Sequence, residues 1–357
     1  MVITASGMIC SVGWDTATAC AAIRAGLSRP VDIEGFELLD EITSEPSALL
    51  GHPISGYTDG FVPPGLWNRL AEGALLDLLE TANPPTTDHA FWDECGLVLV
   101  TPMVDEERFQ VVSSVPPDTI RGTILRYLKT ELALSLDPSR TVLICGGHAA
   151  GIAAFGHAQE LLGLRGVERV LLLALDSYLD PFSLEWLANS DRLRTPDCPV
   201  GLAPGEAGAA LLLETAASAK RRNAFQQATV AAVATAREGG HFLSGGRQHG
   251  VEQARVLEQV VAGRAPFQGQ IVSDLNGEEW RAYEIGCAMS RIPGLLHPQH
   301  QLLAPFESTG DTGTASTLVA TCIAIRSFER HYNPQGQTVV LGASEDGEVA
   351  AALLTAV

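Results

Sequence analysis

The sequence predicts an α/β protein built from two similar halves, and two observations carry this prediction. Apolar, strand-like runs alternate with helical runs, the pattern of a parallel or mixed sheet covered by helices on both faces. The segment GEAGAALLLETA at 205–216 returns as GEVAAALLTAV at 347–357. Such a repeat indicates a duplicated unit, although two Ala/Leu-rich strands can also look alike by chance. We expect halves at 1–217 and 226–357, with the basic run AKRR in the connector between them.

The individual elements follow from apolar runs and the Gly, Pro and polar residues that interrupt them. The opening MVITASGMICSVG has the character of a first strand. Further strands are expected at 141–145, 167–177 and 269–277, and helices at 149–164, 278–291 and 316–332. PVGLAP at 199–204 and TVVLGAS at 338–344 each precede one copy of the repeat, so each copy is expected to close a terminal hairpin.

Composition and charge restrict the class of protein. The chain has 357 residues, is 46% hydrophobic, and carries a net charge of −19, which argues against a nucleic-acid-binding surface. No apolar run reaches the length of a membrane span, and the N-terminus lacks the features of a secretory signal, so a cytoplasmic protein without membrane contact is expected. The seven cysteines show no CxxC pair or zinc-ligand spacing. We therefore expect reduced thiols, no metal and no cofactor.

The segment ICGGHAAG at 144–151 is the strongest local signal of a functional site. An apolar strand ends at a Gly-Gly bend and a helix of small residues begins directly after it. This geometry presents one side chain at a helix N-terminus, where enzymes often place a nucleophile. Here that residue is His148.

Several segments resemble the β-ketoacyl-acyl carrier protein synthases, which have the thiolase fold. GLAPGEAGAALLLE at 201–214 is similar to their GFxPGEGAxALVLE segment, and ALDSYLDP at 174–181 to their GGVDSxxxP segment. ITASGMICSVGWDTATACAAIRAG at 3–26 resembles their opening strand and helix, whereas 30–140 matches poorly. The resemblance implies a five-layered αβαβα sandwich of two duplicated halves and a homodimer whose sheets join across the two-fold axis.

The same resemblance implies that the catalytic residues of the family have been replaced. Those enzymes use a Cys at the elbow, a His from HGTGT and a His from GHTxGAxG. This sequence has His148, Asn276 and Asp311 at the three positions. Phe306 or Glu307 stands at the position of the supporting Lys.

The positions that contact the acyl-pantetheine arm also differ from the family. Glu278 and Trp280, or their neighbours, take the place of the pantetheine-binding threonines, and SEDG at 344–347 takes the place of the GFGG oxyanion loop. The positions expected to contact a ligand are Gly147, Thr312, Ser344 and Glu345. In a shifted alignment Cys145 would be the nucleophile, but the glycines and the helix start align with His148.

The chemistry expected of His148 depends on its neighbours. A helix N-terminus disfavours imidazolium, so His148 is expected to tend toward the neutral form, while Asp311 and Glu345 or Asp346 act in the opposite direction. Neutral imidazole paired with a carboxylate is a competent general base, but it does not form a stable thioester. Alternatively, His148 hydrogen-bonds Asp311 or Asn276 in a satisfied polar network of an unused site. Asp274 is expected to orient the loop that carries Asn276.

Three functions are compatible with these residues. The first is a non-condensing ketosynthase-like protein with a structural or acyl-ligand-binding role, similar to little-characterised proteins encoded near type VI secretion genes. The second is a chain-length-factor-like subunit that pairs with an active ketosynthase. The third is an enzyme that uses His148 and Asp311 as a general base pair for decarboxylation or hydrolysis. An acyl carrier protein is a further candidate partner, although both proteins would be acidic.

Overall fold

The computed structural model describes residues 1–39, 46–82, 89–110, 116–196 and 198–357. Ten strands follow one another in a hydrogen-bonded order, β10-β9-β11-β12-β8-β1-β7-β6-β4-β5, and β2 and β3 form a separate hairpin. The strands are β1 Val2–Cys10, β2 Val31–Leu39, β3 Pro46–Gly51, β4 Cys95–Thr101, β5 Thr141–Cys145, β6 Arg169–Ser177, β7 Glu206–Glu214, β8 Ala228–Arg237, β9 Gln270–Ser273, β10 Gln301–Leu303, β11 Gln337–Ala343 and β12 Glu348–Thr355.

Helices separate the strands, as the alternation in the sequence predicts. They are α1 Thr16–Arg24, α2 Gly65–Ala82, α3 His89–Asp93, α4 Glu106–Phe109, α5 Pro117–Glu131, α6 Ala150–Leu162, α7 Pro181–Asn189, α8 Ala216–Arg221, α9 Val251–Val260, α10 Glu279–Arg291, α11 Phe306–Thr309 and α12 Ser316–Glu329. The α/β fold class is confirmed. Among the described residues, no helix is long and apolar enough to cross a membrane.

The two halves of the chain repeat one strand order. In the first half the order is β1-β7-β6-β4-β5, and in the second it is β8-β12-β11-β9-β10. In each half the first strand pairs antiparallel with the last, and the remaining neighbours pair in the same senses in both halves. The two five-stranded sheets meet at one corner, where Val2 pairs with Thr229 and Ile3 with Ala228. The exact boundaries of the halves remain a prediction.

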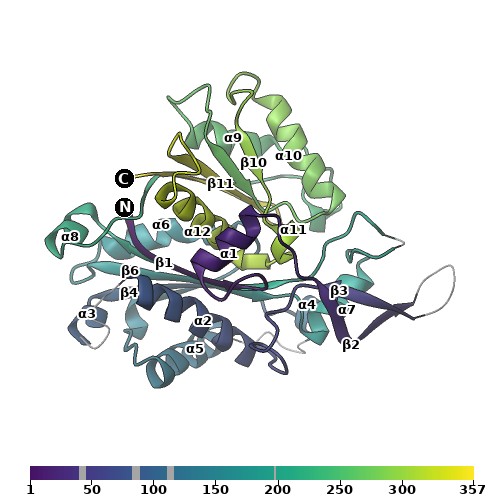
Figure 1. The fold of residues 1–357 in the computed structure, drawn as a ribbon, viewed down its shortest axis with the longest axis horizontal. Coiled ribbons are helices and arrows are strands. Elements are labelled where there is room, and N and C mark those ends of the chain that lie inside the picture. Colours follow the sequence, from purple (N-terminus) through teal and green to yellow (C-terminus); the bar gives the residue numbers. More distant parts are fainter. Residues whose placement is uncertain (40–45, 83–88, 111–115, 197) are drawn as a thin grey trace.

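The elements stack in five layers (Figure 1). Helices α2 and α5 cover the outer face of the first sheet, and α9 and α10 lie beyond the second. Helices α6 and α12 contact each other and both sheets, so they form the central layer. Their apolar side chains join those of both sheets in one buried core. This αβαβα arrangement places the N-termini of α6 and α12 together, where the site lies.

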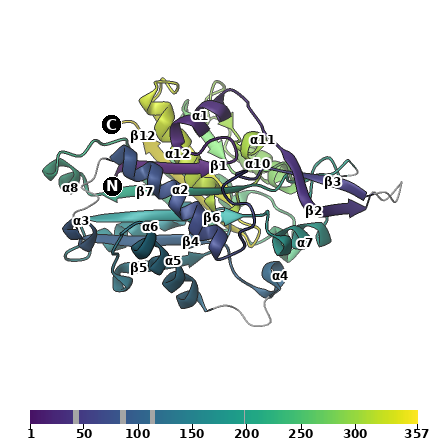
Figure 2. The same cartoon turned by 60° about the horizontal axis from the view of Figure 1, so that its bottom comes forward.

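One segment of the first half differs from the sequence-based expectations. PVGLAP at 199–204 forms no strand, and β7 instead pairs with β1 and β6. Two prolines and a glycine interrupt that segment, and proline cannot donate to a sheet ladder. By contrast, β11 and β12 do form the predicted hairpin. The β2–β3 hairpin projects from the side of the molecule beside α7 (Figures 1 and 2), within the region that matches the family poorly.

Candidate functional site: a buried charge network

The elbow forms where the sequence predicts it, between β5 and α6. Gly146 and Gly147 turn the chain, and His148 lies directly before Ala149, the N-cap residue of α6. A side chain at Gly147 is excluded because its Cβ would lie 2.7 Å from both Cβ and Oγ of Ser344. The loop between β11 and β12 therefore packs directly on the elbow. His148 is 1% exposed, so it faces the interior and not solvent.

Asp311 and Asn276, the two other predicted site residues, meet at His148. Nε2 of His148 lies 2.8 Å from Oδ1 of Asp311. The amide of Asn276 donates to Oδ2 of Asp311 at 2.7 Å, and the backbone N–H of Gly313 donates to Oδ1 at 2.8 Å. The structure thus brings together three residues that are far apart in the sequence. A catalytic role for these three residues stays a prediction.

Two buried arginines extend this cluster into a network of charges. Arg192 donates to both carboxylate oxygens of Glu278, at 2.7 and 2.9 Å, and to Glu345 at 2.9 Å. Arg281 donates to Glu345 and to Asp274, each at 2.9 Å. Arg192 and Arg281 are each only 2% exposed. Buried ion pairs offset the cost of desolvation only when geometry and hydrogen bonding are good, and here Nη1 of Arg192 and Nε of Arg281 have no hydrogen-bond partner among the described residues.

The protonation of His148 differs from the sequence-based expectation. Burial and the charge of Arg281 lower its pKa, but the carboxylates of Asp311 and Glu345 outweigh both and raise the pKa to about 10. The raised pKa favours imidazolium at neutral pH, contrary to the neutral form that the helix terminus alone would favour. The helix terminus is outweighed because carboxylates approach His148 from two sides, with Oε2 of Glu345 3.6 Å from Nδ1. Asp346 takes no part in this cluster, since its side chain contacts Arg237.

Both ring nitrogens of His148 are occupied in either protonation state. Nε2 lies against Asp311, and Nη2 of Arg281 lies 2.9 Å from Nδ1. A neutral ring would donate from Nε2 and accept from Arg281 at Nδ1, and a cationic ring would have no lone pair at all. A general base needs a free lone pair within hydrogen-bond reach of its substrate. This arrangement provides none.

The residues expected to contact a ligand lie in or beside the network. Glu345 belongs to the network itself. Ser344 accepts a hydrogen bond from the backbone N–H of Ala149 at 3.0 Å, and Thr312 is buried at the start of the turn before α12. Each side chain thus contacts protein, and ligand binding by these residues stays a prediction. Asp274, expected to orient the Asn276 loop, accepts from Arg281 and from the backbone of Ala343.

Cys145, the alternative nucleophile, lies in β5 and not at the elbow. It is half-buried, its Sγ lies 3.8 Å from Oγ1 of Thr101, and burial raises the pKa of its thiol. A raised pKa disfavours the thiolate that acyl transfer requires.

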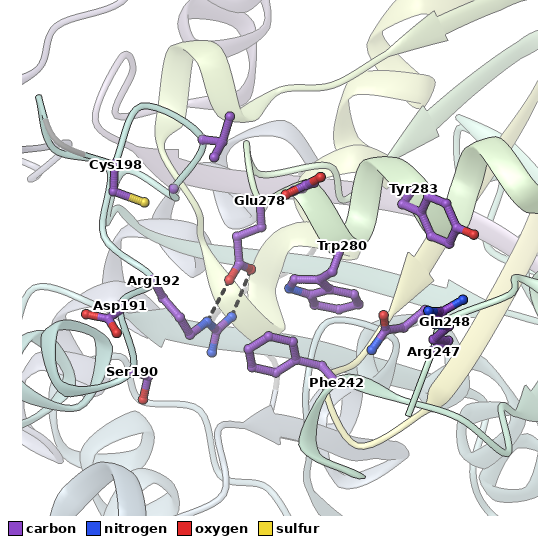
Figure 3. Close-up of a pocket in the computed structure, with 13 residues that line it drawn as sticks. Ser190, Asp191, Arg192, Cys198, Phe242, Arg247, Gln248, Glu278, Trp280 and Tyr283 are labelled. Atoms are coloured by element: carbon purple, nitrogen blue, oxygen red, sulfur yellow. Dashed lines mark hydrogen bonds and ion pairs between the residues drawn. The ribbon is translucent and has the colours of Figure 1, made fainter. Parts of the chain in front are cut away.

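A pocket of about 600 Å³ opens beside the network (Figure 3). Arg192 and Glu278 line it, and His148 does not. Behind this ion pair, Arg192 contacts Glu345, and Glu345 in turn approaches His148. Glu278 contacts Asn276, which also donates to Asp311. The network therefore separates the pocket from the elbow.

The sequence does not reveal Arg192 and Arg281 as members of the site. Arg192 lies in the loop after α7, and its partners are 86 and 153 residues away. For Arg281 a local signal exists, because it lies one helical turn after Glu278 at the start of α10. Charged residues near helix starts are common, so that spacing alone does not identify a buried cation.

The fold of this chain is similar to that of solved structures, although no related sequence was found. No protein-family model matches the chain, and no curated protein sequence matches it. Among solved structures, one chain covers 100% of this chain and 98% of its own length, with a TM-score of 0.79 and 16% identity. It is described as a type II polyketide synthase acyl-carrier protein in complex with its ketosynthase, AntDE:AntF. The fold is that of the ketosynthases.

Two further structures agree with this assignment. The ishigamide ketosynthase/chain length factor matches with a TM-score of 0.72 and 19% identity, covering 100% of this chain and 99% of that one. A beta-ketoacyl synthase from Burkholderia phymatum gives a TM-score of 0.72 at 17% identity with the same coverage. The predicted thiolase-like fold is confirmed over the whole chain. At these identities the comparisons establish the ketosynthase fold and not the activity.

Proposed function

We propose that this chain is a non-condensing ketosynthase-like protein with a structural or acyl-ligand-binding role. The observation that carries the proposal is the buried charge network at the elbow. A ketosynthase needs a thiolate there to accept the acyl group, whereas His148 occupies the position and pairs with Asp311. Buried charged side chains of Arg281, Asp311 and Glu345 surround His148.

The network also argues against the third candidate function, a general base enzyme. His148 has no free ring nitrogen, and its access from the pocket passes the Arg192–Glu278 pair. Asp311 has both carboxylate oxygens engaged. Decarboxylation or hydrolysis by this pair would require the buried cluster to separate first, which is costly for buried charges.

Incubation with acyl-CoA or acyl-loaded carrier protein tests the proposal. We expect no stable adduct in intact mass spectrometry, because imidazole does not hold a thioester. The Cys145→Ser variant serves as the matched control for reaction at the one thiol next to the elbow. An adduct that survives on the wild type and disappears in this variant would show that the chain is acylated, and would overturn the proposal.

The edge strand β5 supports a role as a subunit. The chain would form either a homodimer or a chain-length-factor-like partner of an active ketosynthase. This strand ends the sheet order, and its free edge pairs with no described strand. Val142, Leu143 and Ile144 on it are half-buried. A free edge with apolar side chains favours pairing with a second chain. Similarity to the ishigamide ketosynthase/chain length factor supports the heteromeric alternative.

Light scattering after size exclusion distinguishes these alternatives. We expect a dimer of the pure chain and a monomer for Ile144→Lys, while Leu243→Lys, at an exposed position of a short 3₁₀ turn, leaves the dimer intact. Circular dichroism checks that both variants remain folded. A chain-length-factor-like subunit would instead stay monomeric alone and co-purify with a cysteine-bearing ketosynthase. A wild type that is monomeric and has no such partner would remove the subunit role.

Cytoplasmic location and a relationship to type VI secretion remain proposals that rest on the sequence alone.

A further inference from the structure

We propose that the pocket beside the network binds a small planar aromatic acid. The pocket has a volume of about 600 Å³, within the range of small-molecule sites. It lies on the solvent side of the Arg192–Glu278 pair and does not need a route to His148. The inference therefore holds whether or not the chain has lost condensing activity.

Aromatic side chains form one wall of the pocket (Figure 3). Phe242 and Trp280 stack with their ring centroids 5.2 Å apart and an angle of 25° between the planes. Tyr283 projects from the next turn of α10 and is 53% exposed. Stacked and exposed rings of this kind favour a flat, unsaturated ligand, because aromatic pairs gain from offset stacking beyond their buried area.

Two buried donors at the same pocket lack an acceptor. Among the described residues, neither Nη1 of Arg192 nor Nε1 of Trp280 has a hydrogen-bond partner. The other guanidinium nitrogens of Arg192 are engaged by Glu278 and Glu345. A buried donor without an acceptor is destabilising, and such groups normally have a partner. A ligand that carries acceptor oxygens at one end of a flat ring would supply the missing acceptor.

The charges around the pocket favour a carboxylate as that acceptor. Arg247 is exposed at the pocket, and no ion pair involves it in the described part of the chain. Glu278 is already paired with Arg192, and the remaining carboxylates, Asp191 and Glu279, are exposed to solvent, where their repulsion is screened. Figure 3 places Arg192 and Arg247 on opposite sides of the Phe242–Trp280 pair, so of these two arginines Arg247 is the one open to an incoming anion. An arginine–carboxylate hydrogen bond is stronger than one between neutral groups.

Titration with indole-3-carboxylate and with its neutral amide tests the proposal by calorimetry. We expect the acid to bind at least about tenfold more tightly than the amide. Arg247→Gln should abolish this preference, and Trp280→Phe, which keeps a ring but removes the N–H, should weaken binding of both. Arg264→Gln, at an exposed arginine that does not line the pocket, is the control and should bind like the wild type.

Thiol alkylation gives a second readout that needs no variant. Cys198 lines the pocket, whereas Cys145 is half-buried elsewhere. The acid should slow iodoacetamide labelling of Cys198 and leave labelling of Cys145 unchanged. No binding of either probe at millimolar concentration, tighter binding of the amide, or binding that neither Arg247→Gln nor Trp280→Phe alters would each overturn the proposal.

Discussion

The two halves of this protein share a strand order but supply different charges to the place where they meet. In the first half, β5 passes directly through Gly146 and Gly147 into α6. In the second, the connection from β10 to α12 is longer and contains α11 and a short 3₁₀ turn. The first half contributes the cations His148 and Arg192. The second contributes Arg281 together with four carboxylates: Asp274, Glu278, Asp311 and Glu345.

This difference indicates what the network does for the fold. The carboxylates of the second half outnumber its own Arg281, and the cations of the first half complete the balance. Arg192 reaches Glu278 and Glu345, and His148 reaches Asp311, so each of these pairs crosses between the halves. Neither half alone satisfies its buried charges. These ion pairs therefore connect the two halves at the elbow.

Removing Arg281 should have the largest effect on stability, because its buried ion pairs hold together the part of the network that belongs to the second half. Arg281→Met leaves Asp274 without its ion-pair partner and removes one of the two arginines paired with Glu345, so we expect a loss of about 3–5 kcal/mol in the free energy of unfolding. Urea denaturation measures it. Arg255→Met, at an exposed helical ion pair of the same half, is the control and should cost less than about 0.5 kcal/mol. Equal effects of the two substitutions would mean that the buried network adds no more stability than an exposed ion pair.

The stability should also fall as the solution becomes alkaline. The pKa of His148 is about 10 in the folded protein, against 6.5 as the ordinary value. Its contribution is therefore complete below pH 6.5 and is lost as the pH rises through 10, on the order of 1.4 kcal/mol for each unit of the shift. The pKa values of Asp311 and Glu345 are lowered, because His148 and Arg281 outweigh burial, so their contribution is lost on acidification instead.

Unfolding curves of the wild type and of His148→Gln, measured between pH 5 and 10, isolate this effect. The difference in stability between the two proteins should shrink as the pH approaches 10. A difference that stays constant over the range would show that His148 does not titrate in it.

Asp311→Asn should change the titration of His148 itself. The substitution removes one of the two carboxylates that raise the pKa of His148, so that pKa should fall below about 10. We expect nitrogen-15 NMR to show both ring nitrogens protonated at pH 7 in the wild type. A wild-type spectrum with an unprotonated Nδ1, accepting from Arg281, would contradict the assignment of imidazolium. An unchanged titration in the variant would contradict the pairing with Asp311.

The smallest expected effect concerns a neutral contact between the halves. Ser344→Ala leaves the backbone N–H of Ala149 without its acceptor, and we expect a loss of about 1 kcal/mol. Ser290→Ala removes a hydroxyl that bonds only within an exposed turn of α10, and should be nearly neutral. If both variants have the same stability, the hydrogen bond at Ser344 adds nothing to the docking.

The sequence predicts the parts of this structure that depend on local pattern. The elbow at Gly146–Gly147, the helix after it and the hairpin at β11–β12 all follow from apolar runs and glycines. The failure at 199–204 has a local cause too, since a short apolar run between prolines resembles a strand until the sheet ladder is considered.

The charge network is the part that the pattern does not contain. The elbow pattern singles out His148, but Asn276 and Asp311 follow only from the resemblance to the ketosynthases. The direction in which the pKa of His148 shifts differs from the expectation because Asp311 and Glu345 together outweigh burial and Arg281. Arg192 meets partners 86 and 153 residues away, and nothing in a local window records such a contact. Tertiary structure determines which charges surround a residue, so local sequence patterns do not predict its electrostatic environment.

The position of β1 has a consequence for synthesis of the protein. All nine residues of this strand are buried in the folded chain, yet its main partner, β7, lies about two hundred residues later. At the usual pace of translation this gap corresponds to ~10–40 s. During that interval β1 has neither of its sheet neighbours. We therefore expect β1 to stay without a strand partner in the nascent chain, and slower translation before residue 206 to lengthen its exposure.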